Sequence, residues 1–106
     1  MKFGTFHGGN RPRGYDNPNT YNEQIEQVLY TDKMGFESAW FSEHHFTPNT
    51  ISSPLIMSAY VAGLTKNIRV GPAVQLLPFH NPIRVAEETA LIDVITNGRL
   101  NLGVGK

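Results

Sequence analysis

The sequence has no cysteine among its 106 residues. Disulfides, thiolate zinc sites, iron–sulfur clusters and cysteine nucleophiles are therefore excluded. It also has no run of about 18 consecutive apolar residues, the length that a membrane-spanning helix requires. Its first residues, MKFGTFHGGN, lack the apolar centre of a secretory signal peptide. From these absences we expect a cytoplasmic protein.

No charge of either sign is in surplus. Lys and Arg together number 9, as do Asp and Glu, so the formal net charge is zero. A nucleic acid or an anionic membrane surface is therefore not an expected partner. Hydrophobic residues make up 40% and charged residues 17% of the chain, which is ordinary for a globular protein and argues against disorder. The length allows one domain, residues 1–106, with one core.

Short apolar runs alternate with helical patterns along the chain. Thr20 and Glu23 have the spacing of a capping box at a helix start, and Ser53-Pro54 and Asn81-Pro82 are two further helix starts. The helices are expected from Thr20 to about Gly35, over 53–64, where the pattern is apolar nearly all round, and from Asn81 to about Asn97. The strands are expected at 2–6, 38–42, 68–74 and 99–102, with a loop at 10–19 and a local distortion at Pro72.

This α/β alternation predicts a parallel sheet with crossover helices. Two architectures fit, an open doubly wound sheet or part of a (β/α)₈ TIM-type barrel. The phosphate-binding pattern G-x-G-x-x-G does not follow the first strand, and the terminal GVGK is not a P-loop. A complete barrel has about 250 residues, so this chain would supply the N-terminal half of one.

Polar residues follow the predicted strands where each one ends. Parallel strands bring their carboxyl ends to one rim, which is where both architectures place ligands. The sequence therefore predicts a candidate site at this rim. Its members are His7, the run Glu43, His44 and His45, Gln75, and the segment Gly103 to Lys106.

Structural roles compete with this interpretation. Glu43 could instead cap a helix or pair with Arg11 or Arg13, and Asp93 and Arg99 are expected to form an ion pair. No metal is expected, because adjacent residues of a strand point to opposite faces and His44 and His45 would not share an ion. A Ser–His–Asp triad lacks its G-x-S-x-G turn.

Four segments together resemble one family. These segments are similar, in order and spacing, to the N-terminal part of bacterial luciferase-like flavin-dependent monooxygenases: MKFGTF, MGFESAWFSEHHF, SSPLIMSAYVAGLTKNIRVG and LLPFHNPIRVAEETALIDVITNGRLNLGVGK. The EHHF form resembles the alkanal monooxygenase alpha chain more than the beta chain. The resemblance implies a (β/α)₈ barrel that uses reduced FMN and O₂ to oxidise an aldehyde or another small organic substrate. A flavin reductase would supply the reduced flavin.

The same resemblance implies roles for individual residues. His44 matches the active-site histidine that assists proton transfer near the flavin, and Glu43 and His45 would hold the loop around it. Ala73 and Val74 fall where the family has a non-prolyl cis peptide bond beside the flavin ring. Lys106 falls where the family has an arginine for the flavin phosphate. Glu43, Ala73, Val74, Gln75 and Lys106 are the residues that we expect to contact the cofactor.

Two other functions remain open at this point. The first is an F420-dependent oxidoreductase on the same barrel. The second is a non-catalytic truncated relative that binds flavin or assembles with itself. Because four strands leave two open sheet edges, we expect either the remainder of a longer chain or a homo-oligomer to complete the sheet.

Overall fold

Strands and helices alternate in the computed structural model, which describes residues 1–14 and 16–106. Residue 15, part of the predicted loop at 10–19, lies outside the described residues. The helices are α1 (Asn17–Lys33), α2 (Pro54–Leu64) and α3 (Pro82–Ile95), and a short 3-10 turn, η1, covers Leu77–Phe79. The strands are β1 (Gly4–His7), β2 (Ser38–Phe41), β3 (Arg69–Pro72), β4 (Gln75–Leu76) and β5 (Val104–Gly105).

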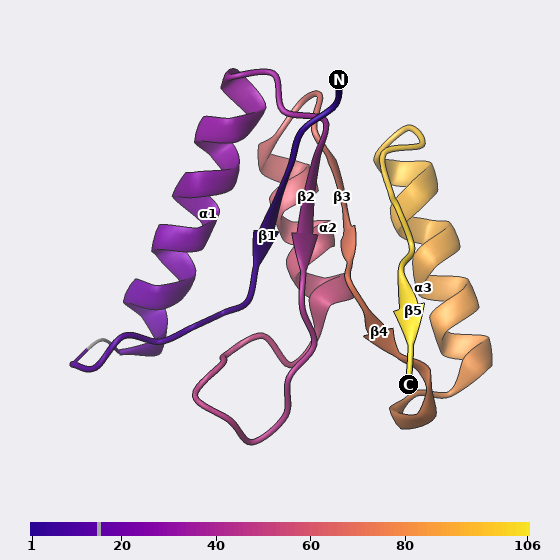
Figure 1. The fold of residues 1–106 in the computed structure, drawn as a ribbon. Coiled ribbons are helices and arrows are strands. Elements are labelled where there is room, and N and C mark those ends of the chain that lie inside the picture. Colours follow the sequence, from indigo (N-terminus) through magenta and orange to yellow (C-terminus); the bar gives the residue numbers. More distant parts are fainter. Residues whose placement is uncertain (15) are drawn as a thin grey trace.

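The strands pair in the order in which they occur. β1 pairs with β2 and β2 with β3, all parallel, and β4 pairs in parallel with β5. Leu100 forms a parallel bridge to Val70, so the segment after α3 lies beside the third strand. In a doubly wound sheet this segment would pair with β1 instead. The sequential order is therefore that of a (β/α)₈ barrel, and every arrowhead points to the same edge (Figure 1).

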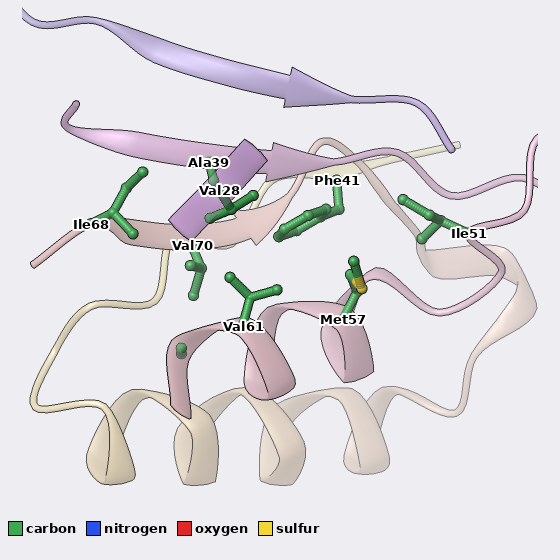
Figure 2. Packing of buried hydrophobic residues seen from close by; sticks show 9 residues of the cluster. Val28, Ala39, Phe41, Ile51, Met57, Val61, Ile68 and Val70 are labelled. Carbon is green, nitrogen blue, oxygen red and sulfur yellow. The ribbon is translucent and has the colours of Figure 1, made fainter. Parts of the chain in front are cut away.

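The helices cover one face of this sheet. Val28 of α1 and Val61 of α2 share a cluster with Phe41 and Val70 of the strands, and Figure 2 shows these side chains gathered between the sheet and α2. Leu55 of α2, Ile92 of α3 and Leu100 form a second cluster. Because the helices share one face, the other face is free for a barrel interior. Among the described residues, no helix has both the length and the apolar character to span a membrane.

Asp32 joins the end of α1 to the loop that leads into β3. Its carboxylate accepts backbone hydrogen bonds from Lys66, Asn67 and Ile68 at 2.8–3.0 Å. Burial raises the pKa of Asp32. The three amide donors and the charge of Arg99 together lower it by more than burial raises it, so the net pKa lies below its ordinary value. The ionised carboxylate thus fixes the position at which β3 enters the sheet.

Helix α1 begins earlier than the predicted capping box. Asp16 is the N-cap residue, and its carboxylate accepts from the amide of Asn19 at 2.9 Å. Thr20 lies inside the first turn and donates its hydroxyl to the Asp16 carbonyl. The predicted start at Thr20 was therefore wrong, because Asp is as good an N-cap as Thr and Pro18 fits the first turn. Ser53 does precede α2 as predicted, but its side chain makes no capping hydrogen bond.

The predicted third strand, 68–74, is interrupted. β3 ends at Pro72, the Ala73–Val74 peptide bond is cis, and β4 resumes at Gln75. The distortion expected at Pro72 is therefore present, one residue further on. The fourth strand was also misplaced, because regular pairing occurs at Val104–Gly105 and only Leu100 of the predicted 99–102 makes a bridge.

The predicted ion pair between Asp93 and Arg99 was wrong. The Asp93 carboxylate accepts from the backbone amide of Leu100 at 3.3 Å. The Arg99 guanidinium donates instead to the Ala62 carbonyl, at 2.8 Å, and to further groups around it. A planar guanidinium has five donors in a fixed fork, and the carbonyls of Ala62 at the end of α2 and of Ile68 before β3 fit that fork.

Candidate active site

The candidate site lies at the carboxyl edge of the sheet. There the loop after β2, the turn η1 and the end of β5 meet at one edge (Figure 1). The predicted residues Glu43, His44, His45 and Gln75 belong to these segments. The strand ends therefore meet at one rim, as the sequence predicts, although they do not all contribute side chains to it.

Glu43 is the centre of the site. Its side chain is 0% exposed, and its Oε1 atom lies 2.7 Å from Nε2 of His45 and 2.7 Å from Nε2 of His80. Its other oxygen, Oε2, accepts from the backbone amide of Leu76 at 2.7 Å. The carboxylate thus ties the loop after β2 to β4 and to His80, between η1 and the N-cap of α3. It neither caps a helix nor pairs with an arginine, which were the two structural alternatives.

These contacts keep Glu43 ionised. Burial raises the pKa of Glu43. Hydrogen bonds from the Leu76 amide, His45 and His80 together lower it by more than burial raises it, so the net pKa lies below its ordinary value. A buried carboxylate that accepts several hydrogen bonds is stable as an anion. Glu43 is therefore a fixed negative charge inside the rim, and the two imidazoles are the groups that can exchange protons.

His80 is a site residue that sequence reasoning missed. It lies 37 positions after Glu43, yet it contacts both Glu43 and the side chain of Gln75. The available signal was its place between the third strand and the helix start at Asn81, where a residue belongs to the rim. Position alone does not reveal the contact, because the path of the chain through β4 and η1 decides which side chains His80 meets.

His44 is separate from this cluster. Its backbone amide donates to the Ile51 carbonyl at 2.8 Å, which closes the loop after β2. Its side chain is half-buried, and within residues 1–14 and 16–106 its imidazole forms no hydrogen bond. The ring is thus available to a molecule at the rim, whereas His45 is held by Glu43 and by an edge-on contact with Phe79, ring centroids 5.2 Å apart.

The remaining predicted residues lie along β4 and β5. Gln75 pairs with Val104 and Leu76 with Gly105, so Lys106 follows directly at this edge. A Cβ atom on Gly105 would lie 2.6 Å from Cγ2 of Val74, so glycine is needed for the two segments to approach. Gln75 is 2% exposed, and one atom of its side-chain amide has no partner among the described residues.

His7 does not belong to the rim. It is 5% exposed and lies against Phe41, with ring centroids 5.4 Å apart, on the sheet face that the helices cover. Its Nε2 contacts the hydroxyl of Thr5 at 2.9 Å, and burial lowers the pKa of His7. The prediction failed because the alternation of side chains along β1 places residues 5 and 7 on the helix face.

Comparisons with known proteins agree with this geometry. The family model for luciferase-like monooxygenases matches residues 1–106. The chain is 38% identical to 4-hydroxyprotoasukamycin monooxygenase of Streptomyces nodosus subsp. asukaensis, over 99% of this chain and 29% of that protein. It is 35% identical to the alkanal monooxygenase beta chain of Aliivibrio fischeri, over 97% and 32% of the two chains. An alpha chain from Photorhabdus laumondii subsp. laumondii is 31% identical, over 98% and 29%, so these identities do not favour the alpha chain.

Solved structures show the same relationship. The oxygenating constituent of 3,6-diketocamphane monooxygenase from Pseudomonas putida, in complex with FMN, has a TM-score of 0.92 at 29% identity, over 99% of this chain and 29% of that one. The F420-dependent tetrahydromethanopterin reductase of Methanopyrus kandleri has a TM-score of 0.69 at 24% identity, over 98% and 26%, which shows a shared fold alone.

The chain thus spans about a third of the length of the relatives it matches. Within that part, the sequential parallel strands, the rim of polar side chains and the match over residues 1–106 agree. The chain belongs to the luciferase-like monooxygenase family.

Proposed function

We propose that the full protein carrying this chain is a flavin-dependent monooxygenase that uses reduced FMN and O₂ to oxidise an aldehyde or another small organic substrate. The observation that carries the proposal is the similarity, over 99% of the chain, to a monooxygenase component whose structure contains FMN. The named curated relatives described above are also monooxygenases. A barrel rim that contains histidines is a suitable place for such chemistry.

The residues at the rim fit the chemical groups of FMN. The phosphate requires a cation, and Lys106 is an exposed cation beside the end of β5. The ring requires an apolar contact, and Val74 is exposed at the adjoining break. The ring edge carries carbonyl and nitrogen atoms, and the buried amide of Gln75 has an unpartnered polar atom. Lysine carries the charge of the family's arginine but not its two-pronged geometry.

Reduced FMN, when bound, would supply the electrons that activate oxygen. The residues of this chain would bind the cofactor and manage protons. Lys106 would neutralise the phosphate, while Ala73, Val74 and Gln75 would shape the ring site. His44, whose ring is free within the described residues, would transfer the proton, because imidazole exchanges protons near neutral pH. Glu43 would hold the neighbouring segments in place through His45, His80 and Leu76.

A titration with FMN tests the proposal directly. We expect saturable quenching of flavin fluorescence when the purified full-length protein is added to micromolar FMN, and oxygen-dependent consumption of reduced FMN by the complex. Native mass spectrometry of the same sample gives the stoichiometry. Binding of F420 without FMN, followed by reduction of F420 by an alcohol, would replace the proposal with an F420-dependent oxidoreductase. A folded protein that binds neither flavin would contradict both.

His44→Ala is expected to reduce turnover at least about 100-fold, since a positioned acid or base typically contributes that much. Flavin affinity should change little, because the variant removes a proton carrier and leaves Lys106 and Gln75 in place. The control is Thr47→Ala in the same loop, whose exposed hydroxyl forms hydrogen bonds, among the described residues, to Asn49 alone. An unchanged rate in His44→Ala would remove this residue from the mechanism.

We also infer that the open edges of the sheet are covered by strands that residues 1–106 of a single chain do not supply. Among the described strands, β1 and β5 each pair on one side only, and Phe6 and Val104 are largely exposed there. Either the remainder of a longer chain or a second copy would cover these edges. The mass of the native protein distinguishes the two arrangements.

A further inference from the structure

The arrangement around Glu43 determines more than the position of the loop. Both histidine Nε2 atoms lie 2.7 Å from the same carboxylate oxygen, which is a hydrogen-bond distance. An ionised carboxylate only accepts hydrogen bonds, so each Nε2 must carry a proton. In the described part of the chain, no group of three His, Cys, Asp or Glu side chains has the spacing to hold a metal ion. The contacts are therefore hydrogen bonds rather than ligands around an empty centre.

We propose that Glu43 is a positioning residue that holds His45 and His80 in the same tautomer, with the proton on Nε2 and an unprotonated Nδ1 on each ring. The two rings are 32% and 27% exposed, although the carboxylate between them is fully buried. Neither Nδ1 atom takes part in a hydrogen bond within residues 1–14 and 16–106. The rim thus presents two proton acceptors in addition to His44.

The side-chain amide of Gln75 can accommodate this assignment. Its side-chain amide adjoins Nε2 of His80, with the amide nitrogen placed towards the ring and the amide oxygen left without a partner. Two donors would then face each other, because His80 Nε2 already carries a proton. Turning the amide over brings its oxygen to the His80 N–H, and the orientation of amides is set by such hydrogen-bond consistency. His80 then donates to Glu43 and Gln75 together.

The tautomers have a consequence for function. An imidazole with its proton held by a buried carboxylate can accept a second proton only at Nδ1. Both rings therefore take up protons on the side away from Glu43. The use of these Nδ1 atoms as acceptors during turnover rests on the proposed monooxygenase function. The tautomers themselves do not, because they follow from the hydrogen bonds of the protein alone.

Glu43→Gln gives a sharp test. The amide oxygen of the new side chain has to face the Leu76 N–H, which is fixed in the backbone. Its NH₂ group then occupies the position of Oε1 and donates its two protons to the two Nε2 atoms. Both rings should therefore change to the tautomer that carries the proton on Nδ1. A purely structural role for Glu43 predicts no coordinated change of this kind.

The measurement is the ¹⁵N chemical shift of each imidazole nitrogen in the purified full-length protein, at a pH high enough to keep both rings neutral. We expect His45 and His80 to be protonated on Nε2 in the wild type and in Glu43→Asp, and on Nδ1 in Glu43→Gln. Glu87→Gln, on the exposed surface of α3, should leave both tautomers unchanged. Nδ1 protonation of either ring in the wild type, which needs no variant to fold, would overturn the proposal. So would a folded Glu43→Gln variant whose rings stay protonated on Nε2.

This result is independent of flavin binding. If the tautomers are as expected but the protein binds no FMN, the positioning role of Glu43 stands and the proposed function fails. If FMN binds and the wild-type rings carry their protons on Nδ1, the proposed function stands and the positioning role fails.

Discussion

Gly71→Ala is expected to lower the free energy of unfolding by about 3 kcal/mol or more, in the upper range of overpacking substitutions. A Cβ atom at Gly71 would overlap the backbone oxygen of Asn101. Both segments are paired, since the Asn101 amide donates to the Val70 carbonyl at 2.8 Å. No side-chain rotation relieves the overlap, so the segment after α3 has to move away from β3. Chemical denaturation of the purified protein measures the loss.

Gly63→Ala is the matched control. Gly63 lies in the last turns of α2 and is exposed, and no atom lies within 4 Å of a Cβ placed there. Alanine is a better helix former than glycine by roughly 0.5–1 kcal/mol. The control should therefore be as stable as the wild type or more stable. If Gly71→Ala were equally well tolerated, β3 would not lie as close to Asn101 as the structure indicates.

The rim could be predicted from the sequence because it depends on topology rather than on individual contacts. Alternating strands and helices fix the parallel sheet, and a parallel sheet brings its carboxyl ends together. Glu43, His45 and Gln75 were found in this way. The placement of His7 failed because one residue of register changes the face of a strand. Its position after the first strand was correct, but its side chain points under the helices.

Contacts over long sequence separations could not be predicted. Glu43 meets His80 across 37 positions. The residue pattern does not give the path of the chain through β4 and η1 that brings the two side chains together. Arg99 was paired with Asp93 because opposite charges six positions apart are a natural choice. In the structure, the guanidinium donates instead to uncharged carbonyls, one of which is that of Ala62 in α2.

Burial of the helices was also only partly predictable. The pattern of 53–64 is apolar nearly all round and favours a well-buried helix. In the structure α2 buries Leu55, Met57 and Val61, but Ile56 is 71% and Tyr60 57% exposed. Val94 and Ile95 at the end of α3 are exposed as well. Hydrophobicity alone does not say which side of a helix meets the sheet when both sides are apolar.

Arg99→Met is expected to lower the free energy of unfolding by about 3 kcal/mol, since hydrogen bonds to charged groups contribute about 1.5–3 kcal/mol each and water replaces part of them. The guanidinium joins the end of α2 to the entry of β3 and to the end of α3. It donates to the carbonyls of Ala62, Ile68 and Thr96 and to the hydroxyl of Thr65, at 2.8–3.1 Å. Methionine keeps most of the stem but offers no donor to these groups.

Arg84→Met is the control of the same chemistry. Arg84 is exposed on α3 and pairs with Glu87 and Glu88 of its own helix, and such pairs contribute only about 0.3–0.5 kcal/mol. Its loss should therefore change stability by less than about 1 kcal/mol.

Arg99→Met should in addition raise the pKa of Asp32, because burial already raises it and the lowering effect of the Arg99 charge is removed. Stability that depends on ionised Asp32 is present above its unfolded-state pKa and is lost as pH falls through the folded-state value. In the variant this acid-dependent loss of stability should therefore be smaller and should be complete at a higher pH than in the wild type. Equal denaturation curves for the two arginine variants would contradict the bridging role of Arg99.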